Sequence, residues 1–378
     1  MWPSLLTDLI GLVALVVGSW RIISGSGSLG DSPVSSGRIE DIRVVIPARD
    51  EAENLSRLLT SLYEDGSVTG PSIIVVDDGS TDATSAVAHL FGCKVIDAPE
   101  PEDTSNGKSS ALASIRSVLL EGPDSGRITF VDADVTFGVG SLKRLYQRSL
   151  DLGGLVSVQP YHATGGFSES MAIFFNVVSL VATGAFVPRS KGDTKAIFGP
   201  VLICGIGDYR RSGGHSAVVG DVLDDVGLGR AFRESGQPTT LFVGHGSIEF
   251  RMYPGGFGDL VSGFRKNIAL GARSTRSWWS ILGFLVVMGA LSAGVVEPLR
   301  SVSTHGAERI WVTVVAYAVW VVFLWFVARR VGRFSLLSYL LFPFPLLVFL
   351  MVLAISTVDV FGGKVKWKGR TIRLGPGT

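Results

Sequence analysis

The sequence has few of the features that indicate a disulfide-stabilised protein or a strongly charged one. Its only cysteines, Cys93 and Cys204, lie far apart, so they predict neither a disulfide framework nor a paired-cysteine metal site. A reducing compartment fits this usage. Lys and Arg number 34 against 33 Asp and Glu, a balance that gives no reason to expect nucleic acid as a partner. Any nucleotide binding must therefore depend on a local site.

Hydrophobic residues are abundant, at 47% of the 378 residues, and they cluster in long runs. A helix needs about 20 apolar residues to cross the hydrocarbon of a bilayer. We therefore expect an N-terminal transmembrane anchor over residues 1–24 and C-terminal transmembrane segments over residues 274–360, in a multi-pass protein of the cell membrane. The runs are Leu5 to Ile23, Trp278 to Val296, Ile310 to Val327 and Phe334 to Val358.

The last apolar run contains Pro343 and Pro345. Because prolines remove hydrogen bonds that lipid cannot replace, this run is expected to be kinked or to form a re-entrant pair of short helices. By the positive-inside rule, the basic loop before it places the catalytic domain in the cytoplasm. The basic tail, residues 361–378, stays on that side only if the run is re-entrant. The loop carries Arg329, Arg330 and Arg333.

Between the anchor and the later spans, the sequence predicts a flexible Gly/Ser-rich linker over residues 25–40 and a folded domain over residues 41–273. From Ile42 to about Tyr161, short apolar runs alternate with helical patterns. This alternation predicts an α/β fold of βαβ units, with ligands at the carboxyl ends of parallel strands. The apolar stretch Ser168 to Val187 carries polar residues such as Glu169, which favours a buried or interfacial helix over a span.

Polar residues follow the first two predicted strands. The first strand runs into IPARDEAEN, from Ile46, and the second into VVDDGSTDAT, with the pair Asp77 and Asp78. Carboxylates at such strand ends can accept hydrogen bonds from a base or a ribose hydroxyl. The alternative is a turn and a helix N-cap made by Ser80 or Asp82, which does not by itself explain the acidic pair.

Two further motifs suit a nucleoside diphosphate. Lys108, in Asn106-Gly107-Lys108, precedes a helical pattern, where a cation and a helix N-terminus can hold phosphate. The run Ile128 to Val131 then leads into Asp132 and Asp134. Their hard oxygen ligands suit Mg²⁺ or Mn²⁺ shared with a diphosphate.

In this order, IPARDEAEN, VVDDGSTDAT, NGKSSAL and VDADV resemble the family 2 glycosyltransferases over most of residues 43–273. The resemblance implies a GT-A fold, a Rossmann-like nucleotide-diphospho-sugar transferase domain joined here to transmembrane helices. It also implies a metal on Asp134 and Asp132. The donor-binding residues that it implies are Pro47, Arg49, Glu51, Asp78, Lys108 and Asp132.

The family's catalytic base is carried by a later acidic pair, which corresponds to Asp224 and Asp225 in VLDDVGLGRAF. The resemblance makes Asp225 the base that deprotonates the acceptor, and Asp224 departs from the usual Glu-Asp. Inverting transfer needs one base on the face opposite the leaving nucleotide, which agrees with this assignment. The alternative is the acidic start of a helix over Val226 to Glu234.

Later motifs resemble the bacterial 4,4'-diaponeurosporenoate glycosyltransferases, which are carotenoid-modifying membrane enzymes, and other lipid-directed relatives. Processive polysaccharide synthases carry Gln-x-x-Arg-Trp where this chain reads GFRKN from Gly263, which argues for single transfer. The resemblance rests on FGP at Phe198 to Pro200, YRRSGGH at Tyr209 to His215, FRMYPGGFGDLVSGFRKN at Phe250 to Asn267 and WKGR at Trp367 to Arg370.

Several residues in these later motifs have two interpretations. On the acceptor side, Gly213, Gly214 and His215 can shape the acceptor pocket together with Asp224, or can form a Gly-Gly turn with a solvent-facing histidine. Arg251 and Lys266 can hold the donor diphosphate, or can be snorkelling residues beside the membrane.

The sequence therefore predicts a metal-dependent inverting transferase that uses a UDP-sugar, expected to be UDP-glucose. Its membrane lipid acceptor is expected to be a carotenoid carboxylate such as diaponeurosporenoate, or a hydroxylated lipid. A polyprenyl-phosphate acceptor is the runner-up and would need a cation cluster. A catalytically silent scaffold is the third hypothesis, against which intact Asp134 and Asp225 argue. Candidate cations are Arg265, Lys266 and Arg273.

Overall fold

The computed structural model describes residues 28–31, 39, 41–100, 107–183, 197–219, 221, 224–274, 278–304, 307–362, 364–367 and 370–373. The expected N-terminal anchor, Asn106 and most of the predicted linker lie outside the described residues. Within the linker, Leu29 is buried in the short 3₁₀-helix η1 (Leu29–Asp31), and the Ser28 hydroxyl donates to the His245 carbonyl at 3.0 Å. This part of the linker therefore packs against the folded domain.

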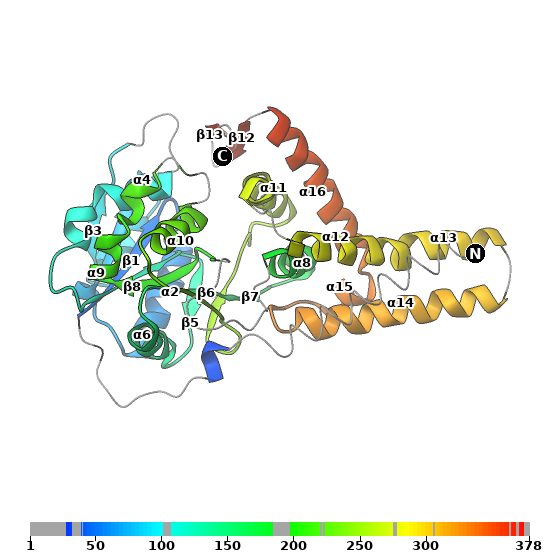
Figure 1. Cartoon of the computed structure of the whole chain (residues 1–378), viewed down its shortest axis with the longest axis horizontal. Coiled ribbons are helices and arrows are strands. Elements are labelled where there is room, and N and C mark those ends of the chain that lie inside the picture. The colour runs from blue at the N-terminus through cyan, green and yellow to red at the C-terminus, as the bar shows by residue number, and fades with distance from the viewer. Residues whose placement is uncertain are drawn as a thin grey trace.

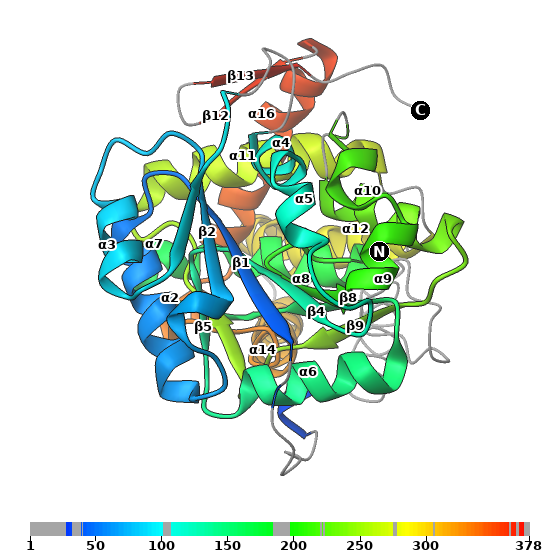
Figure 2. The same ribbon diagram turned by 90° about the vertical axis from the view of Figure 1, so that its left-hand side faces the viewer.

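A seven-stranded sheet forms the centre of the domain, in the order β3-β2-β1-β4-β8-β6-β9 (Figures 1 and 2). Strands β1 to β4 are parallel, whereas β8 is antiparallel to both β4 and β6. The predicted α/β fold is thus confirmed. The strands are β1 Ile42–Ala48, β2 Ile73–Asp77, β3 Lys94–Asp97, β4 Arg127–Val131, β6 Leu155–Gln159, β8 Val201–Gly205 and β9 Thr239–Val243.

Helices cover both faces of this sheet, which is why its strands are apolar without alternation. In β1, Val44 and Ile46 pack into the core beneath α2 and α6, whereas Val45 faces the core of α4, α5, α9 and α10. The helices are α2 Ala52–Asp65, α3 Thr84–Leu90, α4 Gly107–Ser114, α5 Arg116–Leu119, α6 Ser141–Leu152, α9 Ile206–Arg211 and α10 Asp224–Glu234, with 3₁₀ turns η2 Gly70–Ser72 and η3 Gly214–Ala217.

A smaller sheet joins this domain to the apolar helices, in the order β11-β7-β10-β5. Its strands have two or three residues each, too few to show a hydrophobic period, and the sequence did not predict it. Strand β5 begins immediately after Asp134, and β11 follows the long helix α14, Ala307–Ala328. The strands are β5 Val135–Phe137, β7 Tyr161–Ala163, β10 Ile248–Phe250 and β11 Gly332–Arg333.

Three stretches of the described residues are long and apolar enough to span a membrane: Gly283–Val302, Ile310–Ala328 and Pro343–Gly362. The first continues past the predicted end at Val296 through a π-helical turn. Helix α8 is buried among α12, α14 and α16, which confirms the buried helix predicted there. The elements are α7 Phe167–Ser170, α8 Ile173–Thr183, α11 Phe257–Ser274, α12 Trp278–Leu291, the π turn Ser292–Val296, α13 Glu297–Thr304, α14 Ala307–Ala328, α15 Leu336–Leu340, α16 Pro343–Gly362, β12 Lys364–Trp367 and β13 Arg370–Arg373.

The chain is interrupted at the prolines, as predicted, but only one of the two resulting helices is short. Helix α15 ends at Leu340 and α16 begins at Pro343. Pro343 and Pro345 occupy the first turn of α16, where the missing N–H groups have no helical partner to lose. Helix α16 therefore runs unbroken for 20 residues.

Both ends of the α15–α16 segment contact the transferase domain. Before α15, β11 pairs with β7; towards the end of α16, Asp359 accepts from Arg265 Nη2 of α11 at 2.6 Å. Figure 1 shows α12, α13 and α14 extending away from the domain, while α16 runs obliquely back to it and ends beside α11. Whether this segment is re-entrant or crosses the membrane stays a prediction, since α16 is long and apolar enough to span.

We predict that the tail lies on the same side of the membrane as the transferase domain. Single cysteines that replace Glu53, Thr304 and Thr371, labelled in sealed vesicles, would test this. The native thiols of Cys93 and Cys204 should react slowly, because both are buried and burial raises their pKa. A membrane-impermeant maleimide should label positions 53 and 371 from one side and position 304 from the other. Labelling of 371 together with 304 would rule out the re-entrant arrangement.

Candidate active site

The loops after β1 and β2 are fastened to each other at the carboxyl edge of the sheet. The Thr81 N–H donates to Asp50 Oδ1 at 2.7 Å, and the Ala52 N–H donates to Asp82 Oδ2 at 3.1 Å. Asp82 also accepts from the Thr84 N–H at the start of α3, but the N-cap residue of this helix is Ala83 rather than the predicted Ser80 or Asp82. Asp77 is structural as well, because it is buried and accepts from the Ser80 N–H at 2.8 Å. Asp78, by contrast, is half-buried.

The loops after β1 and β4 meet where the strand order reverses, which is where open α/β sheets bind ligands. The strands are adjacent, with Val45 opposite Phe130. Glu51, at the start of α2, is close enough for its charge to raise the pKa of Asp134. The structure thus brings the predicted residues Pro47, Arg49 and Glu51 to the same edge as the Asp132–Asp134 motif.

Asp132 and Asp134 have different surroundings. Asp132 accepts from Lys108 Nζ at 2.5 Å, whereas burial, and then the charges of Asp132 and Glu51, raise the pKa of Asp134 to about 8. A divalent cation would stabilise the ionised form of Asp134, because its neighbours Asp132 and Glu51 are negatively charged. The described residues contain no group of three or more His, Cys, Asp and Glu placed to hold a metal. The motif therefore fits an ion held by one or two carboxylates and completed by substrate phosphate.

Two lysines from different helices face these carboxylates. Burial alone would lower the pKa of Lys108, on α4, but the charges of Asp132, Asp224 and Asp225 outweigh it and raise that pKa. Burial lowers the pKa of Lys266, on α11, against the opposing attraction of Asp224. The structure therefore brings both predicted lysines to one group of carboxylates. This group, called the acidic cluster below, consists of Asp132, Asp134, Asp224 and Asp225.

Asp225 lies against the FGP loop, and Gly199 makes this approach possible. A Cβ at position 199 would stand 2.8 Å from Asp225 Oδ2. The next residue, Pro200, accepts through its carbonyl from the Asp132 N–H at 2.9 Å. One short loop thus contacts both the predicted base and the predicted metal motif.

The pKa values of the two members of the acidic pair are shifted in opposite directions. Burial, followed by the charge of Asp224, raises the pKa of Asp225 to about 6. For Asp224, burial also favours the neutral form, but Lys108, His215 and Lys266 outweigh it and lower the pKa. Both residues lie in the first turn of α10, so the acidic helix start is confirmed, while the catalytic role of Asp225 stays a prediction. Such separated pKa values are typical of acid–base sites.

His215 is buried, with 2% of its surface exposed, so the alternative of a solvent-facing histidine is wrong. Burial lowers its pKa to about 4, and its Nδ1 lies 2.8 Å from the Tyr209 hydroxyl. Gly213 and Gly214 have φ of 80° and 58°, and a Cβ at Gly214 would stand 2.3 Å from the Tyr209 ring. The glycine turn therefore seats a neutral histidine beside Asp224. Its predicted role in the acceptor pocket stays a prediction.

Arg251 does not join the lysines, because Glu169 holds its guanidinium through both Nε, at 3.0 Å, and Nη2, at 2.7 Å. Its backbone N–H instead donates to the Asp134 carbonyl at 3.1 Å. In the sequence, Glu169 stands out only as a polar residue within an apolar stretch. The available signal was a single acid in an apolar helix, which requires a partner.

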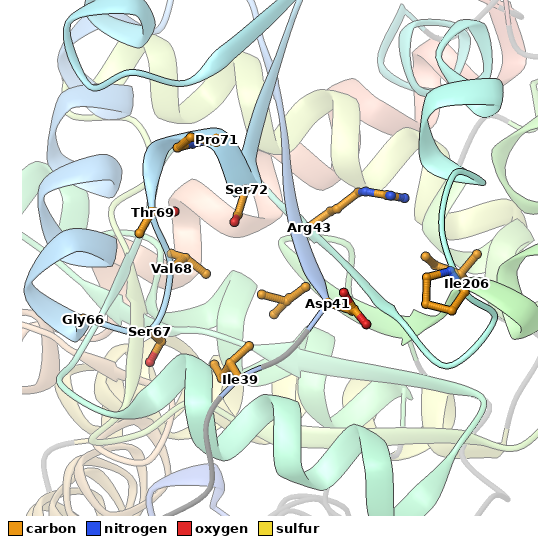
Figure 3. Close-up of a pocket in the computed structure, with 12 residues that line it drawn as sticks. Ile39, Asp41, Arg43, Gly66, Ser67, Val68, Thr69, Pro71, Ser72 and Ile206 are labelled. Atoms are coloured by element: carbon orange, nitrogen blue, oxygen red, sulfur yellow. The ribbon is translucent and has the colours of Figure 1, made fainter.

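A separate pocket of about 430 Å³ opens at the opposite edge of the sheet (Figure 3). Asp41, Ile42 and Arg43 line it where β1 begins, together with Thr69 and Ser72 before β2. Because it lies at the amino ends of the parallel strands, it is remote from the acidic cluster and does not belong to the candidate active site.

Comparison with known proteins agrees with this geometry. Glycosyl transferase family 2 matches residues 43–188. The 4,4'-diaponeurosporenoate glycosyltransferase of Staphylococcus aureus strain USA300 is 31% identical over 340 residues, which cover 87% of each chain. That of strain MRSA252 is 32% identical over 338 residues, also with 87% of each chain.

Among solved structures, the chain is similar to the mannosyltransferase PcManGT from Pyrobaculum calidifontis in complex with GDP-Man and Mn²⁺. The TM-score is 0.50 at 13% identity, over 94% of this chain and 99% of that one. The fold and the site define a GT-A glycosyltransferase with apolar helices. The identity with the staphylococcal enzymes shows its family: the chain belongs to the family 2 glycosyltransferases.

We predict that Gly199→Ala lowers kcat by about 100-fold, because a displacement of the order of 1 Å at a reacting group has this effect. The added methyl group would push the Asp225 carboxylate away from its seat. Gly258→Ala is the control, since a Cβ there meets nothing within 4 Å. Steady-state kinetics on both variants would test whether kcat depends on the position of the Asp225 carboxylate, once their melting temperatures are shown to match the wild type. Equal kcat values would contradict this dependence.

Proposed function

We propose that the protein transfers glucose from UDP-glucose, with inversion, to a membrane lipid, and that this lipid is a carotenoid carboxylate such as diaponeurosporenoate. The observation that carries the proposal is the convergence of Asp225 with Lys108, Lys266 and the Asp132–Asp134 motif at one edge of the sheet. The identity with the staphylococcal 4,4'-diaponeurosporenoate glycosyltransferases supports the acceptor class.

Asp134 and Asp132 would hold Mg²⁺ or Mn²⁺, as the crowding of Asp134 suggests and as the Mn²⁺ in the mannosyltransferase complex supports. When bound, the ion supplies positive charge to the diphosphate that leaves. Lys108 adds a cation on the same side through its pairing with Asp132. The loops with Pro47, Arg49, Glu51 and Asp78 are placed to bind the nucleoside.

Asp225 acts on the acceptor. Its raised pKa makes it a stronger base than an ordinary aspartate, able to take the proton of an acceptor hydroxyl as the new bond to the sugar forms. Asp224 stays ionised because the charges of Lys108 and Lys266 outweigh its burial. A carboxylate acceptor is already ionised near neutral pH, so Asp225 would then orient it rather than deprotonate it.

The acceptor reaches the site from the apolar helices. Helix α11 carries Lys266 into the acidic cluster and packs along α16, so one helix joins the reacting groups to the apolar part of the chain. By the positive-inside rule, the arginines between α14 and α15 support a cytoplasmic transferase domain. A polyprenyl-phosphate acceptor is disfavoured because Arg265, one of its candidate cations, is paired with Asp359.

We predict that turnover requires both a divalent cation and Asp225. Purified protein, offered UDP-glucose, Mn²⁺ and a carotenoid or hydroxylated lipid extract, should release UDP and form a glycolipid detectable by mass spectrometry. Asp225→Asn should lower kcat by about 10²- to 10⁴-fold with an alcohol acceptor, and less with a carboxylate. EDTA should stop the reaction.

The control for that experiment is Asp151→Asn, an exposed aspartate on α6, which should match the wild type. Full turnover by Asp225→Asn would refute the assignment of the base. Tight UDP-glucose binding with no turnover of any acceptor would instead support a silent scaffold.

The rate with an alcohol acceptor should depend on pH through Asp225. The base works only as a carboxylate, so with a folded-state pKa of about 6 the activity is full above about pH 7. It falls roughly tenfold per pH unit below 6, as expected for one essential proton. The pH profile of kcat/KM would show this, and an acid limb near pH 4 would mean that Asp225 titrates as an ordinary carboxyl.

A further inference from the structure

Glu169 makes an ion pair with Arg251 at the junction of the transferase domain and the apolar helices, and the carboxylate side of this pair is buried. Its side chain is 6% exposed, it lies on α7 directly before α8, and both of its oxygens accept from Arg251. The Gly165 N–H also donates to Glu169 Oε2 at 2.8 Å. A carboxylate so enclosed would be strongly destabilising without its partner, so the pair holds α7 against the end of β10.

The backbone of Arg251 connects this pair to the metal motif. Its N–H donates to the carbonyl of Asp134 at 3.1 Å, and the strands on either side, β10 and β5, pair with Phe250 opposite Val135. Arg251, which is held by Glu169, therefore fixes the backbone of the turn that carries the Asp134 carboxylate.

The same helix is tied to the chain between α14 and α15. The Ser335 N–H donates to the Ser170 hydroxyl at 3.0 Å, and the Thr164 hydroxyl donates to the Arg333 carbonyl at 2.5 Å. Helix α7 thus contacts the end of β10 through Glu169, and the segment before α15 through the neighbouring Ser170.

We propose that Glu169 is a positioning residue for the metal and diphosphate end of the site, acting through Arg251 on Asp134. This inference rests on the proposed metal-dependent transfer. It assigns Arg251 a structural link in place of the direct diphosphate contact expected from the sequence. Partners behind a metal ligand typically change metal affinity or activity by about 10- to 100-fold when they are removed.

The chain offers a matched control in the same sheet. Glu249, on β10, pairs with Arg333 at 3.7 Å, but these side chains are 38% and 67% exposed. Exposed pairs of this kind contribute little. Glu249→Gln also removes one negative charge, but it leaves the Glu169–Arg251 pair intact.

The test measures Mn²⁺ affinity by electron paramagnetic resonance of the free ion, on the full-length protein in detergent with UDP present. Glu169→Gln should weaken Mn²⁺ binding by about 10- to 100-fold, whereas Glu249→Gln should change it less than about twofold. Arg251→Lys should behave like Glu169→Gln, because lysine lacks the two-pronged geometry of the guanidinium. Unchanged Mn²⁺ affinity in Glu169→Gln would overturn the proposal.

A second pair of variants keeps both charges and serves if Glu169→Gln does not fold. A Cβ at Gly165 would stand 2.3 Å from Arg251 Nη2, whereas one at Gly166 meets nothing within 4 Å. Gly165→Ala should therefore weaken Mn²⁺ binding and Gly166→Ala should not. Equal affinities in this pair would count against the proposal.

UDP binding without metal separates this role from direct contact. If Arg251 contacts the diphosphate directly, Arg251→Lys should weaken metal-free UDP binding. Glu169→Gln should then preserve or improve UDP binding, because it frees the guanidinium. This pair of results would overturn the positioning role. A wild-type protein that binds no Mn²⁺ even with UDP contradicts the proposed metal dependence instead, so the two failures are distinguishable.

Discussion

The concentration of negative charge at one edge of the large sheet is the constraint on which the site depends. Asp132 and Asp134 come from the turn between β4 and β5, and Asp224 and Asp225 from the first turn of α10. The negative charges of neighbouring carboxylates raise the pKa values of Asp134 and Asp225. Lys108 and Lys266 offset part of this repulsion, each from a different helix. The remaining negative charge favours binding of a cation and raises the pKa of Asp225. Packing elsewhere serves to hold these groups together against their repulsion.

Much of the domain could be predicted from the sequence, because long strands and amphipathic helices have periods that a single chain displays. Strands β1, β2 and β4 lie where the apolar runs indicated, and the polar residues after them meet at the expected edge. The break at Pro343 could also be predicted, since proline's effect on a helix is local.

What the sequence could not show depends on contacts between distant residues. The burial of His215 depends on Tyr209 and Phe130 closing around it, and a Gly-Gly turn alone leaves this open. The partner of Arg251 is 82 residues away, and nothing in the pattern near either residue identifies the other. The strands of the small sheet are individually too short to recognise and form only through their mutual pairing.

That small sheet has a consequence for how the protein is made. Its strands are drawn from residues 135–137, 161–163, 248–250 and 332–333, so it cannot close until the ribosome has released the chain beyond α14. The large sheet can assemble earlier from the N-terminal part of the chain, as domains generally do during synthesis. The turn that carries Asp134 therefore reaches its final form late, after helix α14 has left the ribosome. A nascent chain cannot complete the candidate site before then.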